Sequence, residues 1–167
     1  QPLMAQSFAG DVYNSAVYLK RCFPEVSSDM ITVTGQDKLS IQMLEKFESQ
    51  KLGIDWVFQH PHKSPGLYLI ETDATGERHF VYWRSDSAAR KIMSFLDDEA
   101  LQSVAGGDMF FFSGISLAVI EEPAREDFWQ KLQRIKESGC SIVFDPNFRE
   151  RLWSGPDQAK NAFQKAF

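Results

Sequence analysis

Long hydrophobic runs are absent from this sequence, and so are internal repeats and low-complexity tracts. The longest apolar runs, such as residues 109–112, are far too short to span a bilayer. No basic, apolar and small-residue sequence opens the chain, as a secretory signal would. These absences argue against membrane insertion and against secretion.

Cysteine and basic residues are also scarce. Cys22 and Cys140 lie far apart, whereas a disulfide framework needs more or closer cysteines, so we predict two buried free thiols and a cytoplasmic protein. The formal net charge is -5 and the pI about 5.2. This balance argues against nucleic acid or a membrane surface as partner. It still allows a small anion, because a few arginines can bind one inside an acidic protein.

The usual motifs for phosphate and metal binding are missing too. No Walker-type glycine-rich loop occurs, because Gly106-Gly107 precedes a predicted strand instead of following one. His60 and His62 have no acidic or thiol partner at metal-ligand spacing, so they are predicted to be loop residues. We therefore predict no metal site among the residues of this chain.

What is present indicates a folded α/β domain. The 167 residues are 43% hydrophobic and 25% charged, which is enough for one domain with a substantial core. Helical and strand patterns alternate along the chain, which predicts a mostly parallel sheet covered by helices. The predicted helices are 11–23, 37–53, 97–104, one between Pro123 and Gly139, and one from Pro156 onward; the predicted buried strands are 30–34, 109–113 and 141–144.

The faces of the first two helices can also be predicted from spacing. In the first, Val12, Ala16, Leu19 and Phe23 recur on one helical face, and Pro24 ends the helix. In the second, Asp37 is the predicted N-cap and Gly53 the predicted end. Its inward side chains are predicted to be Leu39, Met43, Leu44 and Phe47.

A β-hairpin is predicted in the middle of the chain. Residues 66–73 and 78–84 are strand candidates, and residues 74–77 supply the turn. In the second strand Phe80, Tyr82 and Arg84 share one face, and Val81 and Trp83 share the other. The aromatic density indicates that this hairpin packs on something, such as a subunit or a ligand site that it covers.

Three polar segments could carry chemistry, and each has an alternative explanation. Asp11 and Asn14 follow Gly10 at a helix start and could bind sugar hydroxyls, although spacing alone favours simple helix capping by Asp11. Tyr82 and Arg84 could cover a carboxylate, or could form an ordinary exposed hairpin face. Residues 144–149 follow a strand at the edge where parallel sheets bind ligands, but could be a plain turn with a solvated arginine.

Together these segments resemble the 2-keto-3-deoxygluconate kinases (2-dehydro-3-deoxygluconokinases) of the PfkB, or ribokinase-like, family. The segment from Gly10 matches their Gly-Asp-x-x-Asn-x-x-Val-Tyr pattern, although Ala9 replaces a preceding glycine. The resemblance continues through the hairpin, the Ser-Gly-Ile-Ser strand end and the Asp-x-Asn-x-Arg-x-x-Leu-Trp segment. The matching segments are residues 7–19, 65–78, 82–84, 112–118 and 145–153.

The resemblance implies a fold and a set of site residues. The expected fold is a ribokinase-like α/β core with helices on both faces, formed by residues 1–66 and 86–167, with a projecting β-hairpin lid at 67–85. The implied reaction is phosphorylation of 2-keto-3-deoxygluconate by ATP with Mg²⁺, in a homodimer that pairs through the lid. The implied substrate-binding residues are Gly10, Asp11, Asn14, Tyr68, Tyr82, Arg84 and Arg149, of which the two arginines would bind the carboxylate and keto end.

One part of the family pattern does not occur. These kinases carry a downstream Gly-Ala-Gly-Asp segment that supplies the anion hole and the catalytic base, and this sequence has none. We therefore expect a fragment that lacks the C-terminal nucleotide-binding part, the first strand ahead of Gln1 and any catalytic residue of its own. Two alternatives stay open: a kinase of a neutral sugar such as fructose or ribose, and a non-catalytic module that binds sugar acids or dimerises.

Overall fold

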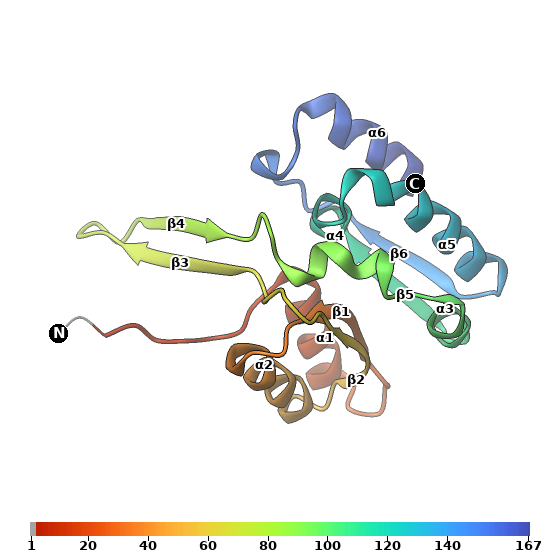
Figure 1. Cartoon of the computed structure of the whole chain (residues 1–167), viewed down its shortest axis with the longest axis horizontal. Coiled ribbons are helices and arrows are strands. Elements are labelled where there is room, and N and C mark those ends of the chain that lie inside the picture. The colour runs from red at the N-terminus through yellow and green to blue at the C-terminus, as the bar shows by residue number, and fades with distance from the viewer. Residues whose placement is uncertain (1–2) are drawn as a thin grey trace.

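The computed structural model describes residues 3–167 as helices and strands that alternate along the chain, apart from one projecting hairpin (Figure 1). The six strands of residues 3–167 form three pairs, and helices pack against two of these pairs. The elements in order are α1 (Asp11–Cys22), β1 (Asp29–Thr34), α2 (Lys38–Ser49), β2 (Gly53–Gln59), β3 (Leu67–Thr72), β4 (Arg78–Trp83), η1 (Ala88–Ser94), α3 (Asp98–Ala105), β5 (Met109–Ser113), α4 (Gly114–Val119), η2 (Glu122–Ala124), α5 (Arg125–Glu137), β6 (Ser141–Asp145), η3 (Glu150–Leu152) and α6 (Pro156–Ala166).

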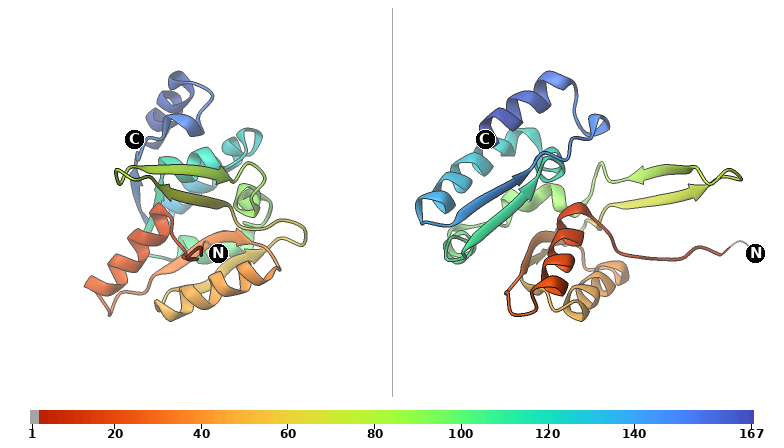
Figure 2. Two further views of the ribbon diagram at one scale, coloured as in Figure 1. Left: turned by 90° about the vertical axis from the view of Figure 1, so that its left-hand side faces the viewer. Right: turned by 180° about the vertical axis from the view of Figure 1, so that it is seen from behind.

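Two of the three strand pairs are parallel. β1 pairs with β2 and β5 pairs with β6, each across a helical connection, while β3 and β4 form an antiparallel hairpin. Parallel pairs joined through helices are the units of an open α/β sheet, so the predicted fold class is confirmed. The hairpin projects from the body in Figure 1 and in the right-hand view of Figure 2.

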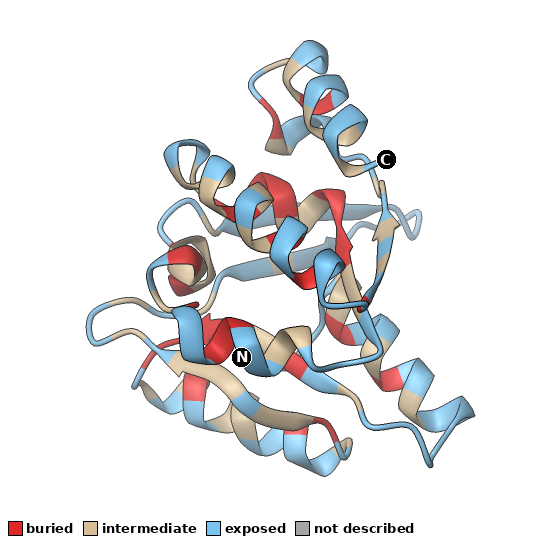
Figure 3. Ribbon diagram, turned by 90° about the vertical axis from the view of Figure 1, so that its right-hand side faces the viewer, coloured by how far each residue is buried: buried red, intermediate tan, exposed pale blue. Residues whose placement is uncertain are grey.

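Helices lie on both faces of the β1–β2 pair. Adjacent residues of a strand point to opposite faces. Met30 belongs to a small core with α1 and α2, whereas Ile31 packs against the larger core around β5 and β6. Buried positions accordingly lie on the inner sides of the helices, with exposed residues outside (Figure 3). No helix among residues 3–167 has the length and apolar character needed to cross a bilayer.

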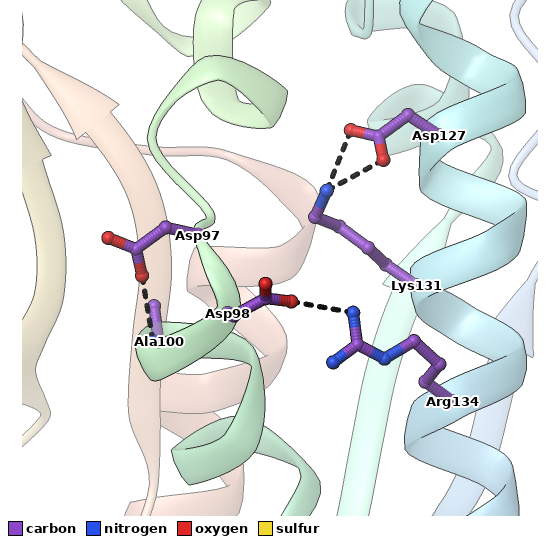
Figure 4. A network of polar contacts seen from close by, with 6 residues as sticks. All are labelled: Asp97, Asp98, Ala100, Asp127, Lys131 and Arg134. Carbon is purple, nitrogen blue, oxygen red and sulfur yellow. Dashed lines mark hydrogen bonds and ion pairs between the residues drawn. The ribbon is translucent and has the colours of Figure 1, made fainter.

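The start of α3 has an N-cap and one ion pair to α5 (Figure 4). Asp97 caps α3 by accepting a hydrogen bond of 2.9 Å from the backbone N–H of Ala100. The next residue, Asp98, forms an ion pair of 2.7 Å with Arg134 of α5. Hydrogen bonding to this guanidinium, together with its charge, lowers the pKa of Asp98. The ion pair thus links the first turn of α3 to α5 at the surface.

Several predicted details were wrong. Leu19 and Phe23 are exposed, and α1 instead buries Tyr13 and Val17, because the Tyr13 ring packs on Phe47 with 5.2 Å between centroids. The stripe predicted for α1 was therefore rotated by about one position. Cys22 is exposed, so only one of the two free thiols is buried as predicted.

The end of α2 also differs from the prediction. The helix ends at Ser49, and Lys51 takes the left-handed conformation with φ 60°. Gly53 instead begins strand β2, which was not predicted. Its residues are mostly half-buried and mix polar with apolar side chains, so neither alternation nor a continuous apolar run marked it.

Candidate functional site

Asp11 lies where three distant segments of the chain meet. It is the first residue of α1, and its Oδ2 atom accepts hydrogen bonds from the Ser113 hydroxyl and from the Asn147 side-chain amide, the latter at 3.2 Å. The N-cap position belongs to Gly10, so the Asp11 carboxylate is used for tertiary contacts and the helix-capping alternative does not describe it. This cluster is half-buried or buried throughout.

The cluster lies at the carboxyl edge of the β5–β6 pair, where open parallel sheets bind ligands. Ser113 is the last residue of β5 and pairs with Asp145, the last residue of β6. Asn147 follows two residues later with φ 32°, and its backbone N–H donates to the Asp145 carboxylate at 3.1 Å. The turn that leaves β6 thus carries the Asn147 side chain to Asp11.

Gly114 makes this arrangement sterically feasible. A Cβ atom at this position would lie 1.9 Å from the Pro146 carbonyl oxygen and 2.9 Å from the Phe163 ring. Only glycine allows the two chain segments to come so close. The glycine of the Ser-Gly-Ile-Ser pattern is therefore needed to seat the turn after β6 against the start of α4.

The hairpin brings three predicted site residues together. Tyr68 and Tyr82 are directly opposite each other in the β3–β4 register, with 6.0 Å between ring centroids. The guanidinium of Arg84 lies over the Tyr82 ring, 4.1 Å from its centroid, which is a cation–π contact. Within residues 3–167 this guanidinium has no hydrogen bond or ion pair, so its N–H donors are available to a ligand.

The base of the hairpin is held by contacts between its two ends. Lys63 forms an ion pair with Asp86, and the backbone N–H of Ala88 donates to the Ser64 carbonyl at 2.9 Å. Hydrogen bonding to Lys63 and its positive charge lower the pKa of Asp86. The strands beyond this clasp have no comparable attachment, and every residue of β4 is exposed.

The other predicted site residues adjoin the Asp11 cluster in the sequence. Gly10 directly precedes Asp11, Asn14 lies one helical turn after it, and Arg149 follows Asn147 by two residues. Arg149 is exposed just before η3, and its guanidinium makes no hydrogen bond or ion pair within the described part of the chain. Asn14 is exposed on α1 and lines a shallow hollow that it shares with Phe8, Tyr18 and Lys46. Gly10 is exposed as well, and among the described residues a Cβ there would meet only Tyr13 Cβ, at 3.8 Å.

Ser113 and Asn147 were not selected as individual site residues from the sequence. Both fall in segments that carry the family resemblance, but neither has a spacing relation to Asp11 that a single sequence could show. Across residues 3–167 no group of three or more His, Cys, Asp or Glu side chains is placed to hold a metal ion. Chemically, the Asp11 carboxylate can accept hydrogen bonds from hydroxyl groups, and the two arginines can donate hydrogen bonds to an anion.

The whole sequence is similar to known carbohydrate kinases. Residues 1–167 match the sequence pattern described as pfkB family carbohydrate kinase. A curated relative, 2-dehydro-3-deoxygluconokinase of Haemophilus influenzae, is 37% identical over 163 residues, which cover 96% of this chain and 52% of that protein. The chain thus spans about half the length of the curated relatives it matches.

Solved structures show the same architecture. The PfkB protein from Polaromonas sp. JS666 superposes with a TM-score of 0.81 at 19% identity, covering 92% of this chain and 50% of that one. The fructokinase with bound ATP from Xylella fastidiosa gives a TM-score of 0.77 at 20% identity, covering 94% of this chain and 47% of that one. At these identities the likeness concerns the fold alone.

Proposed function

Because the chain belongs to the pfkB family of carbohydrate kinases, we propose that it forms the substrate-binding part of a kinase that phosphorylates 2-keto-3-deoxygluconate. ATP with Mg²⁺ would be the phosphate donor, bound mostly by residues other than those described here. The name of the Haemophilus influenzae relative supports this sugar acid as substrate. These 167 residues by themselves are expected to recognise the sugar acid without transferring phosphate, because their sequence has no Gly-Ala-Gly-Asp segment.

The observation that carries the proposal is the uncompensated charge of Arg84. Its guanidinium is oriented by the Tyr82 ring and has no acidic partner among residues 3–167. A planar guanidinium can bind a carboxylate through two parallel hydrogen bonds, and a neutral sugar cannot use this charge. In the proposed complex Arg84 and the exposed Arg149 bind the carboxylate and keto end of the substrate, while Gly10, Asp11 and Asn14 face its hydroxyls and Tyr68 and Tyr82 cover it.

The decisive test compares an acidic with a neutral sugar. Calorimetry should show that Arg84→Ala and Arg149→Ala each weaken binding of 2-keto-3-deoxygluconate roughly 10- to 100-fold, because a charge-assisted hydrogen bond is lost. Fructose binding should change far less. Arg78→Ala on the hairpin and Arg151→Ala in η3 are the matched controls, since both are exposed arginines outside the proposed site. Equal losses for both sugars would refute carboxylate recognition and favour a neutral-sugar kinase.

We also propose that two copies of the chain pair through the hairpin. Leu67, Val81 and Trp83 share one face of it and are all exposed, with Trp83 at 56%. An apolar two-stranded ribbon that is exposed to solvent on both faces is only marginally stable by itself. The hairpin of a second copy of the chain would cover one of these faces. Sedimentation should show a dimer that Trp83→Ser weakens and Tyr18→Ser, an exposed aromatic on α1, does not. A monomer at all concentrations would refute the pairing.

A further inference from the structure

The two oxygens of the Asp11 carboxylate have different surroundings. Oδ2 accepts from both the Ser113 hydroxyl and the Asn147 amide, whereas Oδ1 accepts no hydrogen bond from any of residues 3–167. The donors come from positions 102 and 136 residues away in the sequence. Two long-range donors on one oxygen fix the plane of the carboxylate and leave the other oxygen to a ligand.

The donors are themselves held in place. Ser113 is fully buried, and its backbone and hydroxyl exchange hydrogen bonds with Ser116 in a capping box at the start of α4. Asn147 is held in the left-handed region by its backbone bond to Asp145 and by the close approach of Pro146 to Gly114. The Ser113 side chain and the Asn147 backbone are thus held independently of Asp11, so the position of the Asp11 carboxylate follows from theirs.

We infer that Ser113 and Asn147 are positioning residues that orient Asp11 Oδ1 to accept a hydrogen bond from a hydroxyl of the sugar. This inference rests on the proposed function and deepens it. An ionised carboxylate only accepts hydrogen bonds, so the ligand group facing Oδ1 must be a donor. A sugar hydroxyl qualifies, whereas the keto and carboxylate oxygens of a sugar acid do not, and those oxygens are left to the arginines. Asp11 would therefore help to set the orientation of the bound sugar.

A double-mutant cycle with Asp11 separates positioning from general structural support. Asn147→Gly removes the amide and suits the left-handed backbone, and Ser113→Ala removes the hydroxyl. Each change should weaken binding of 2-keto-3-deoxygluconate roughly 10-fold in the otherwise unchanged chain, because a bond to a charged group is lost. In a chain that already carries Asp11→Ala, the same changes should have less than about a 2-fold effect.

The control is Ser116→Ala, which weakens the same helix cap by removing the hydroxyl that accepts from the Ser113 backbone N–H, without removing a donor to Asp11. It should lower the midpoint of thermal unfolding and leave affinity for the sugar unchanged. If Ser113→Ala does not fold, Asn147→Gly alone completes the cycle. Equal effects of these changes with and without Asp11, or no effect in either, would overturn the positioning role.

The outcomes also separate this inference from the proposed function. If the chain prefers fructose to the sugar acid, the proposed substrate is wrong, and the same cycle measured with fructose still tests the positioning of Asp11. If the sugar acid binds and Asn147→Gly binds it as tightly, the positioning role alone is wrong. If neither sugar binds, both are wrong.

Discussion

The two halves of the candidate site are built in opposite ways. At the β5–β6 edge, residues remote in sequence meet in a cluster whose donors are already oriented, and Ser113 is fully buried. On the hairpin, neighbours in one ribbon stack on one another, and no residue of β4 is shielded from solvent. The comparison teaches that the fold fixes the Asp11 cluster, whereas the hairpin keeps exposed surface that a ligand or a second copy of the chain could bury.

The first way to break this comparison is to remove one aromatic ring from each half. Phe112 is 3% exposed, and its ring centroid lies 4.9 Å from Phe144 and 5.3 Å from Phe128. Phe112→Ala should lower the free energy of unfolding by about 3–5 kcal/mol, because it leaves a cavity. Phe80 is 40% exposed, and Phe80→Ala should cost less than about 1 kcal/mol. Urea unfolding followed by tryptophan fluorescence measures both, and similar losses would mean that the hairpin is as well packed as the body.

A smaller loss of stability is expected when the glycines near Asp11 are replaced by alanine. Gly114→Ala should lower the free energy of unfolding by about 1–3 kcal/mol, because its methyl group would overlap the Pro146 carbonyl. Gly10→Ala is the matched control, since the nearest atom would be Tyr13 Cβ at 3.8 Å, and should cost less than about 1 kcal/mol. Thermal or urea unfolding of the two variants side by side tests the claim. A tolerated Gly114→Ala would show that the turn after β6 is not fixed.

The smallest expected effect is a local one at the tip of the hairpin. The pKa of Asp73 is lowered, chiefly by the Thr75 hydroxyl and also by backbone N–H groups of Thr75 and Glu77. A lowered pKa means that the carboxylate stabilises the turn above its ordinary pKa, and that this support is lost as the pH falls through the lowered value. Amide NMR signals of Thr75 and Glu77 should therefore shift on acidification while core signals do not.

The variant Asp73→Asn provides the control for that titration. Its side-chain oxygen can still accept the turn hydrogen bonds but does not titrate in this range. The shifts at Thr75 and Glu77 should then lose their dependence on acid pH. If they persist unchanged, a different group is responsible.

Local patterns predicted most of the elements, though not β2, because the causes of most elements are local. The hairpin was predicted in full, because alternation and turn residues are neighbours in the sequence. The helix starting after Asp97 and the strand 109–113 were also correct within a residue. The buried face of α1 was wrong, because the position of Phe47 decides which side of the helix is covered.

The candidate site was predictable only in outline. The rule for parallel sheets pointed to the segment after β6, and that segment does lie beside Asp11. The contacts of Ser113 and Asn147 with Asp11 could not be predicted, because they depend on how separate elements pack. Whether the seven predicted binding residues act together on one ligand stays a prediction.

The clasp at the base of the hairpin has a mechanical consequence. With six residues in each strand, the ribbon is a lever arm roughly 20 Å long. A pivot of about 10° at the clasp formed by Lys63 and Asp86 would sweep the tip through about 3.5 Å, taking the arm length from strand geometry. Small changes in the backbone torsion angles near Gly66 would therefore be amplified at the tip of the hairpin and would leave the body in place. The backbone passes close to Arg84 there, since a methyl group at Gly66 would lie 3.1 Å from the Arg84 Cβ.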